Sequence, residues 1–169
     1  MKRFLIAALL AAVAGTLPAN PCFYEGGYAG GNAIFCYDPD GGRIYQGGYA
    51  GGNARYSLEL SGSVERIYRG GYAGGNAIYT YDTREKRLYQ GGYAGGNPVC
   101  CCSTDGSVLR IYEGGYAGGN AAYSIDRSGS QWRVYRGGYA GGNAIFTISD
   151  AYDIPRSMLV FMVARVLGD

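Results

Sequence analysis

The chain has 169 residues, among them 31 glycines, 18 tyrosines and no histidine, and its formal net charge is +2. The lack of histidine excludes hydrolytic triads built on that residue, and the near-neutral charge excludes the strongly basic surface of a nucleic-acid-binding domain. Tyrosine, isoleucine and valine recur at fixed places, which is not typical of a disordered glycine-rich chain.

Residues 1–19 have the three parts of a secretory signal peptide. Lys2 and Arg3 form a short positive start, an apolar stretch follows, and Ala19 stands at the expected cleavage site. The apolar stretch is too short to span a membrane; an uncleaved N-terminal anchor is the alternative. Cleavage removes two of the 15 basic residues and leaves 13 basic and 13 acidic residues. We therefore expect an exported protein of no net charge, located in the periplasm, at the cell surface or outside the cell.

One heptapeptide, Gly-Gly-Tyr-Ala-Gly-Gly-Asn, occurs six times without a change and holds 24 of the 31 glycines. The copies begin at Gly26, Gly47, Gly70, Gly91, Gly114 and Gly137. Their spacing of 21 or 23 residues is typical of a repeat architecture. The residues before and after each copy are aromatic or β-branched, which favours strands. Each unit is therefore predicted to be a strand, a glycine turn, a second strand and a variable turn.

The variable turns differ in length by two residues, and an even difference keeps the side chains of the next strand on the same face. The aliphatic position before each glycine turn, occupied by Phe23 in the first unit, is predicted to lie in the core. In the strand after the turn, the alternate positions that begin with Phe35 and Tyr37 are also predicted to be buried. The position between them is predicted to be less buried. It holds Cys36, Ser57, Thr80, Cys101, Ser124 and Thr147.

Residues 150–169 break the repeat. The apolar run from Met158 to Ala164 is too short to cross a bilayer. Because the terminal repeats of an array need a cap, we expect this segment to be a buried strand or a short helix that covers the array. Attachment to a membrane surface is the alternative.

Export makes disulfide bonds possible. Cys22 and Cys36 flank the first heptapeptide symmetrically, so we predict a cross-strand disulfide between them. Cys100, Cys101 and Cys102 are consecutive, and in a strand Cys101 points to the opposite face from its neighbours. Because the three thiols cannot converge on one ion, we interpret them as small apolar residues and predict neither a metal site nor a cofactor.

The fold is therefore predicted to be all-β. Residues 20–149 form six tandem β-hairpin repeats of about 22 residues each, in a radial, flower- or propeller-like array or in a stacked one. Residues 150–169 are the short C-terminal capping segment.

Two families have similar repeats. Residues 67–70 (Ile-Tyr-Arg-Gly) and the strand after the turn resemble the repeat of the bacterial beta-flower proteins, and residues 97–99 (Asn-Pro-Val) are similar to its Pro-Ile or Pro-Val step. This resemblance covers residues 23–149 and implies a compact array of hairpins that carries no established activity. Residues 24–28 (Tyr-Glu-Gly-Gly-Tyr) and 112–116 resemble the opening of a MORN repeat, whose later Gly-x-Gly is missing here. Both families imply tandem β-hairpins.

No constellation of catalytic residues is found. The acidic residues lie mainly in the variable turns, without the facing pair that glycoside hydrolysis requires. The glycine turn lacks the Lys and Ser or Thr of a phosphate-binding loop. Residues 38–42 (Asp-Pro-Asp-Gly-Gly) are too short for a calcium loop. We therefore predict that the protein is not an enzyme.

Three rows of repeated residues remain as candidates for binding. The tyrosines are Tyr28, Tyr49, Tyr72, Tyr93, Tyr116 and Tyr139; the asparagines are Asn32, Asn53, Asn76, Asn97, Asn120 and Asn143; the arginines are Arg43, Arg66, Arg87, Arg110 and Arg133. Each row has a structural explanation: asparagine bonds its own turn, tyrosine covers glycines, and arginine pairs with turn carboxylates. A row of tyrosines is also a stacking platform, so the tyrosines and asparagines are predicted to bind a polysaccharide or an extended peptide.

The resulting hypothesis is an exported, non-enzymatic module that binds or scaffolds at the cell envelope. The alternative is a structural subunit that self-associates through its sheet edges. We expect neither a nucleic-acid partner nor a membrane span in the mature chain. Burial of the apolar C-terminal run would favour the binding module, and its exposure would favour assembly or membrane attachment.

Overall fold

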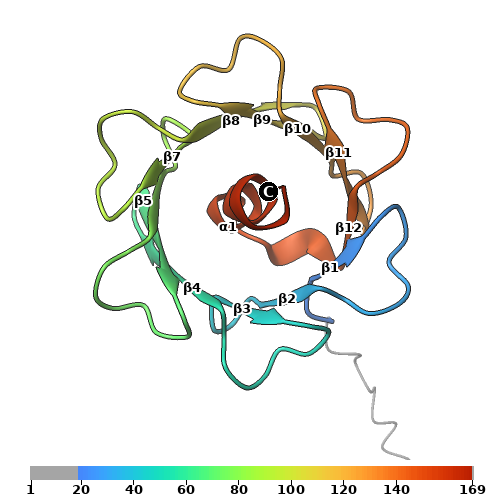
Figure 1. Ribbon diagram of the computed structural model, residues 1–169, viewed down its shortest axis with the longest axis horizontal. Helices are drawn as coiled ribbons and strands as arrows, with labels where there is room; N and C mark the ends of the chain where they lie inside the picture. The colour runs from blue at the N-terminus through green and yellow to red at the C-terminus, as the bar shows by residue number, and fades with distance from the viewer. Residues whose placement is uncertain (1–18, 169) are drawn as a thin grey trace, which may run out of the picture.

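The computed structural model describes residues 19–168, so the predicted signal peptide lies outside the described residues except for Ala19. The described chain forms a closed barrel of antiparallel strands with a helix inside it (Figure 1). The strands are β1 (Cys22–Glu25), β2 (Phe35–Asp38), β3 (Arg43–Gln46), β4 (Tyr56–Ser61), β5 (Val64–Arg69), β6 (Tyr79–Asp82), β7 (Arg87–Gln90), β8 (Cys100–Asp105), β9 (Val108–Glu113), β10 (Tyr123–Asp126), β11 (Trp132–Arg136) and β12 (Phe146–Ser149). They are followed by the 3-10 turn η1 (Ala151–Asp153), the helix α1 (Arg156–Phe161) and the π-helical segment η2 (Met162–Leu167). The predicted all-β array of hairpin repeats is confirmed.

Closure of the barrel selects the radial arrangement over the open stack. Each strand pairs with its neighbours in sequence, and β1 pairs with β12 through a register that places Cys22 opposite Ser149. Every described strand therefore has a partner on both sides. Self-association through sheet edges, the alternative drawn from the sequence, finds no free strand in the barrel.

The two lengths of variable turn are accommodated as the even difference predicts. The short β2–β3 hairpin ends at the pair Asp38 and Arg43, whereas the longer β4–β5 hairpin continues to Ser61 and Val64. The extra residues lengthen this hairpin without reversing its faces. The aliphatic positions before the glycine turns are consequently all inside the barrel and at most 1% exposed; they are Phe23, Ile44, Ile67, Leu88, Ile111 and Val134.

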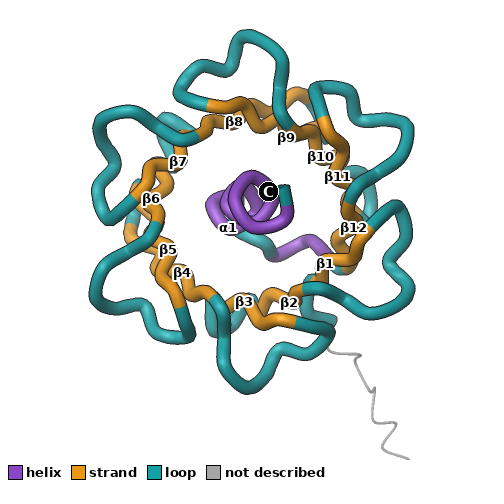
Figure 2. The backbone as a smooth tube through the Cα atoms, viewed as in Figure 1, coloured by secondary structure: helices purple, strands orange, loops and turns teal. Residues whose placement is uncertain are grey.

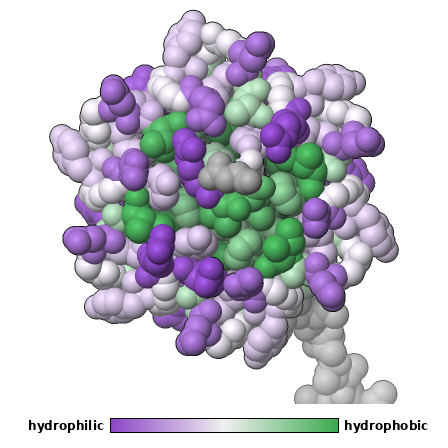
Figure 3. Space-filling model, in the orientation of Figure 1, coloured by the Kyte–Doolittle hydropathy of each residue, from purple (hydrophilic) through white to green (hydrophobic). Residues whose placement is uncertain are grey.

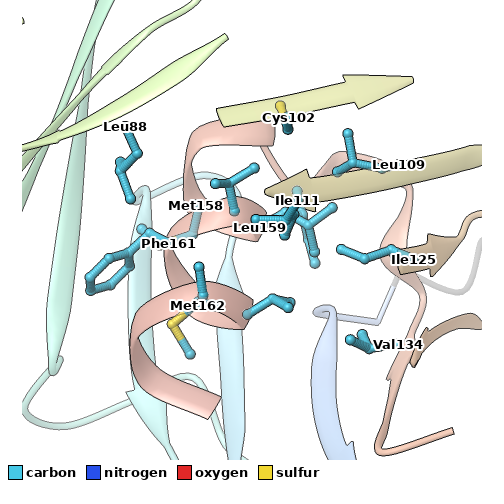
Figure 4. Packing of buried hydrophobic residues seen from close by; sticks show 14 of the residues in the cluster. Leu88, Cys102, Leu109, Ile111, Ile125, Val134, Met158, Leu159, Phe161 and Met162 are labelled. Carbon is cyan, nitrogen blue, oxygen red and sulfur yellow. The ribbon is translucent and has the colours of Figure 1, made fainter. Parts of the chain in front are cut away.

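The C-terminal helix fills the interior of the barrel (Figures 1 and 4). A barrel of about eight strands is already just wide enough for its inward side chains to fill, so twelve strands leave space for a further element. All residues from Ser157 to Ala164 are buried, and the ring of Phe161 packs 4.9 Å from that of Tyr56 and 5.3 Å from that of Tyr79, measured between centroids. The apolar run is therefore helical and lies within the barrel rather than across one end. Among the described residues, no helix combines the length and the apolar character needed to cross a membrane.

The outer face of the barrel corrects one expectation from the sequence. The small residues between the two inward positions, from Cys36 in β2 to Thr147 in β12, are at most 3% exposed. They are covered from outside: Cys101, for example, packs with Tyr112, which lies opposite it in β9, and with Ala121, which follows a glycine turn. The strands of the barrel, here called the wall, are thus buried on both faces. The polar character of these small residues did not indicate exposure.

Candidate functional site

The six heptapeptides form six loops, here called petals 1 to 6. They span residues 26–32, 47–53, 70–76, 91–97, 114–120 and 137–143. Because neighbouring strands are antiparallel, all six petals leave the same end of the barrel, and they extend outward around it (Figure 2). The variable turns lie at the opposite end.

The glycines give each petal its conformation for two separate reasons. The first glycine of every petal has a φ between 71° and 89°, a region that side chains rarely adopt. The fifth residue, Gly30 in petal 1, lies directly beneath the ring of Tyr28, so that a Cβ atom there would overlap the ring. The same overlap recurs in all six petals. The tyrosine therefore packs on its own loop, in agreement with the structural explanation of this row.

Neighbouring petals also contact one another. The second glycine of petal 2, Gly48, lies against Ala33, the residue that follows petal 1; a Cβ atom on Gly48 would be 3.7 Å from that of Ala33. The contact recurs around the barrel and closes between Gly27 of petal 1 and Ala144 after petal 6. The petals thus form a continuous ring with the same symmetry as the barrel.

Side chains of the wall hold the petals in place. Arg43 Nε donates a hydrogen bond to the carbonyl oxygen of Gly71 in petal 3 (2.9 Å), and Arg110 Nε makes the equivalent bond to Gly138 in petal 6 (3.0 Å). The hydroxyl of Thr80 donates to the carbonyl oxygen of Gly91 at 2.6 Å. These bonds tie petals 3, 4 and 6 to the strands of the barrel and restrict the conformations open to these loops.

The petal tyrosines are 74–80% exposed. Each lies on a different petal, and the petals point away from one another around the barrel (Figure 1). The ring–ring pairs found among the described residues both involve Phe161 and include no petal tyrosine. The tyrosines therefore present six separate aromatic faces rather than the continuous row that their spacing in the sequence indicated.

The petal asparagines are all exposed, and the expected structural role is not found for them. Within residues 19–168 none of their side chains makes a hydrogen bond to its own turn or elsewhere, and none of them has a positive φ. Bonding of the turn and left-handed backbone are the usual reasons for asparagine in such a loop. Six identical amides thus face solvent with their donors and acceptors unused.

Two pockets with the same lining lie between neighbouring petals. The first, about 390 Å³ in volume, lies between petals 2 and 3; the second, about 500 Å³, lies between petals 6 and 1. Their shared lining is an arginine and a tyrosine of the wall, an asparagine, the alanine after it, and glycine of the next petal. In the first pocket these are Arg43, Tyr45, Asn53, Ala54 and Gly71; in the second they are Arg133, Tyr135, Asn143, Ala144 and Gly27. We call these the inter-petal pockets.

The wall arginines fall into two groups. Arg66, Arg87 and Arg110 form ion pairs with Glu59, Glu85 and Asp105; Glu85 lies in a variable turn, as expected, whereas Glu59 and Asp105 lie in β4 and β8. Arg43 and Arg133, the two that line the inter-petal pockets, form no ion pair within the described part of the chain. Each pocket therefore combines a guanidinium, an amide and a phenol, with no carboxylate in its lining.

Comparison of the chain with protein-family models, with curated proteins and with solved structures found no match. The beta-flower and MORN resemblances therefore stay predictions.

The structure divides the cysteines as their positions in the sequence indicate. Cys22 and Cys36 are joined by a disulfide bond. Cys100 and Cys102 belong to the core inside the barrel, whereas Cys101 belongs to a cluster on the outer face. No three Cys, Asp or Glu side chains gather as metal ligands in residues 19–168.

Burial controls the chemistry of these three thiols. It raises the pKa of Cys100 to about 12 and also raises the pKa values of Cys101 and Cys102. At about pH 8 iodoacetamide is therefore expected to leave all three unmodified in the folded protein and to modify them in concentrated guanidinium chloride. Since an unfolded thiol has a pKa of about 8.5, the raised pKa of Cys100 also lowers the free energy of unfolding as the pH rises from about 8.5 toward 12. Mass spectrometry checks the prediction; rapid labelling of the folded protein would contradict it.

A third pocket, of about 350 Å³, lies beside the barrel mouth and was not anticipated from the sequence. It is lined by Ala54, Arg55, Tyr56, Arg69 and Gly70. A signal was present in the repeat: Arg55 occupies a position that is aliphatic in the other five units. Those residues are Ile34, Ile78, Val99, Ala122 and Ile145.

Proposed function

We propose that this protein is an exported, non-enzymatic module that binds a hydroxyl-rich polymer, a polysaccharide, through its ring of petals. The single observation that carries the proposal is the state of the petal asparagines. They are identical in all six petals, exposed, and without hydrogen bonds in the described structure. An amide that donates and accepts at once suits sugar hydroxyls, and an exposed tyrosine supplies the flat apolar face on which a sugar ring packs.

Two further features support this function over the alternatives. The disulfide between Cys22 and Cys36 is typical of proteins that fold in an oxidising compartment, which supports export to the envelope or beyond. Six equivalent petals on one rigid ring favour a ligand with repeating chemistry, because linked weak contacts add up to strong binding. An extended peptide is the competing ligand, but the closed barrel has no free strand edge to which a peptide strand could add.

The proposal is tested with an array of bacterial and plant polysaccharides. Changing one asparagine, Asn76→Ala, is expected to weaken binding by less than about tenfold, whereas changing all six is expected to weaken it by about 100-fold or more, since the sites act together. Ser61→Ala with Thr104→Ala is the control, because both side chains are exposed at the opposite end of the barrel. Unchanged binding by the six-fold variant would reject the asparagines as ligand contacts, and lack of binding by the original protein would reject the proposed function.

A further inference from the structure

Two arginines come together at the junction of petals 2 and 3, outside the sixfold pattern. The backbone amide of Gly70 donates to the carbonyl oxygen of Arg55 at 2.8 Å, and Tyr56 pairs with Arg69 across β4 and β5. Arg55, directly before β4, and Arg69, the last residue of β5, are therefore neighbours. Both side chains are exposed, and both line the pocket of about 350 Å³ beside the barrel mouth.

Among residues 19–168, no carboxylate pairs with these two arginines. Neither Arg55 nor Arg69 forms an ion pair in the described structure, and no carboxylate lines their pocket. The residues equivalent to Arg69 before petals 2 and 4 are the neutral Gln46 and Gln90. Neighbouring like charges on a sheet are unfavourable unless an anion joins them. Figure 3 shows this end of the barrel, where hydrophilic residues interrupt a hydrophobic surface at the mouth.

The pair also adjoins an inter-petal pocket. The pocket of Arg55 and Arg69 shares Ala54 and Gly70 with the pocket that contains Arg43 and Asn53. A chain bound at Asn53 therefore reaches the two unpaired guanidinium groups without leaving the same petal junction. The planar guanidinium binds carboxylate oxygens in pairs, which makes arginine well suited to a carboxylate on a bound polymer.

From this geometry we infer that the junction of petals 2 and 3 is an anion site that receives the carboxylate of an acidic polysaccharide. The inference deepens the proposed function and rests on it, since it names the class of polymer. Petals elsewhere on the ring contact the neutral hydroxyls of the same chain. Arg55 and Arg69 bind one of its carboxylates and so determine which petal junction the charged sugar occupies.

The test compares polygalacturonate with its methyl ester, which has the same backbone without the charge. The purified protein is expected to bind polygalacturonate at least about tenfold more tightly, and sodium chloride is expected to weaken only that binding. The variant with Arg55→Ile and Arg69→Gln takes both residues from other units of the repeat and is expected to lose this preference. Arg136→Gln is the matched control: it removes the same charge from the equivalent position before petal 6, where the neighbouring residue is Ala122.

The possible outcomes distinguish failure of the anion site from failure of polysaccharide binding. Loss of the preference in the double variant but not in Arg136→Gln supports the anion site. Equal binding of both polymers, or a double variant that keeps the preference, overturns the anion site and leaves polysaccharide binding standing. Binding of neither polymer by the original protein overturns the inference, and the array of polysaccharides then decides the proposed function separately.

Discussion

Replacing Phe161 with alanine is expected to lower the free energy of unfolding by about 3–5 kcal/mol, the usual cost of removing a buried phenylalanine. Phe161 is 2% exposed and lies inside the barrel, where it joins α1 to the tyrosines of β4 and β6. The surrounding wall is a closed hydrogen-bonded ring, so it cannot collapse into the space that the ring leaves. We therefore expect the loss to fall toward the upper part of that range.

Urea denaturation followed by tryptophan and tyrosine fluorescence measures this loss. Tyr152→Ala is the control, because Tyr152 is an aromatic residue of the same C-terminal segment that is 67% exposed. It is expected to change the free energy of unfolding by no more than about 0.5 kcal/mol. Equal stability of the Phe161 and Tyr152 variants would show that the helix does not belong to the cooperative core.

The second large effect is expected at the disulfide. Replacing Cys22 and Cys36 with serine removes a link between residues 14 positions apart, and a closed loop of about 15 residues contributes about 3 kcal/mol by restricting the unfolded chain. The bond also joins β1 to β2, next to the seam where β1 meets β12. Loss of the bond is thus expected to loosen the seam first.

The comparison of reduced and oxidised protein provides an internal check. A reducing agent is expected to lower the urea midpoint of the original protein to that of the double serine variant and to leave the variant unchanged. Hydrogen exchange should then be fastest for the amides of β1. A reducing agent that has no effect on the midpoint would show that the bond does not form or does not contribute.

Much of the fold follows from the repeat, because its signals are local. The even difference between the turns fixes which face each strand presents, and the burial of Ile44 and Ile67 follows from the sequence pattern alone. Closure of the barrel is not a local property. The pairing of β1 with β12 depends on the summed curvature of six units, and no single residue in the sequence indicates it. The C-terminal run was recognised as apolar, but its place inside the barrel depends on the width that closure creates.

The candidate site was predicted in part. The petal tyrosines and asparagines were singled out by their repetition, but their spacing along the chain did not reveal that the petals point in different directions. The small residues such as Thr80 were expected to be less buried because they are polar, whereas the petals cover them and Thr80 uses its hydroxyl to hold Gly91. Arg55 was overlooked because its signal is a departure from the repeat, and the other candidates were recognised by what the units share.

The seam between β1 and β12 also sets the order in which this chain folds. Each hairpin forms from residues close together in sequence, but the seam joins residue 22 to residue 149, and contacts over such separations form late. A chain that emerges with its N-terminus first therefore keeps one side of β1 unpaired until the last strand arrives, and the segment that fills the interior emerges later still. The export proposed above would benefit from this timing: a ring that cannot close before its last strand arrives would let the chain pass through a narrow channel unfolded and complete its folding afterwards.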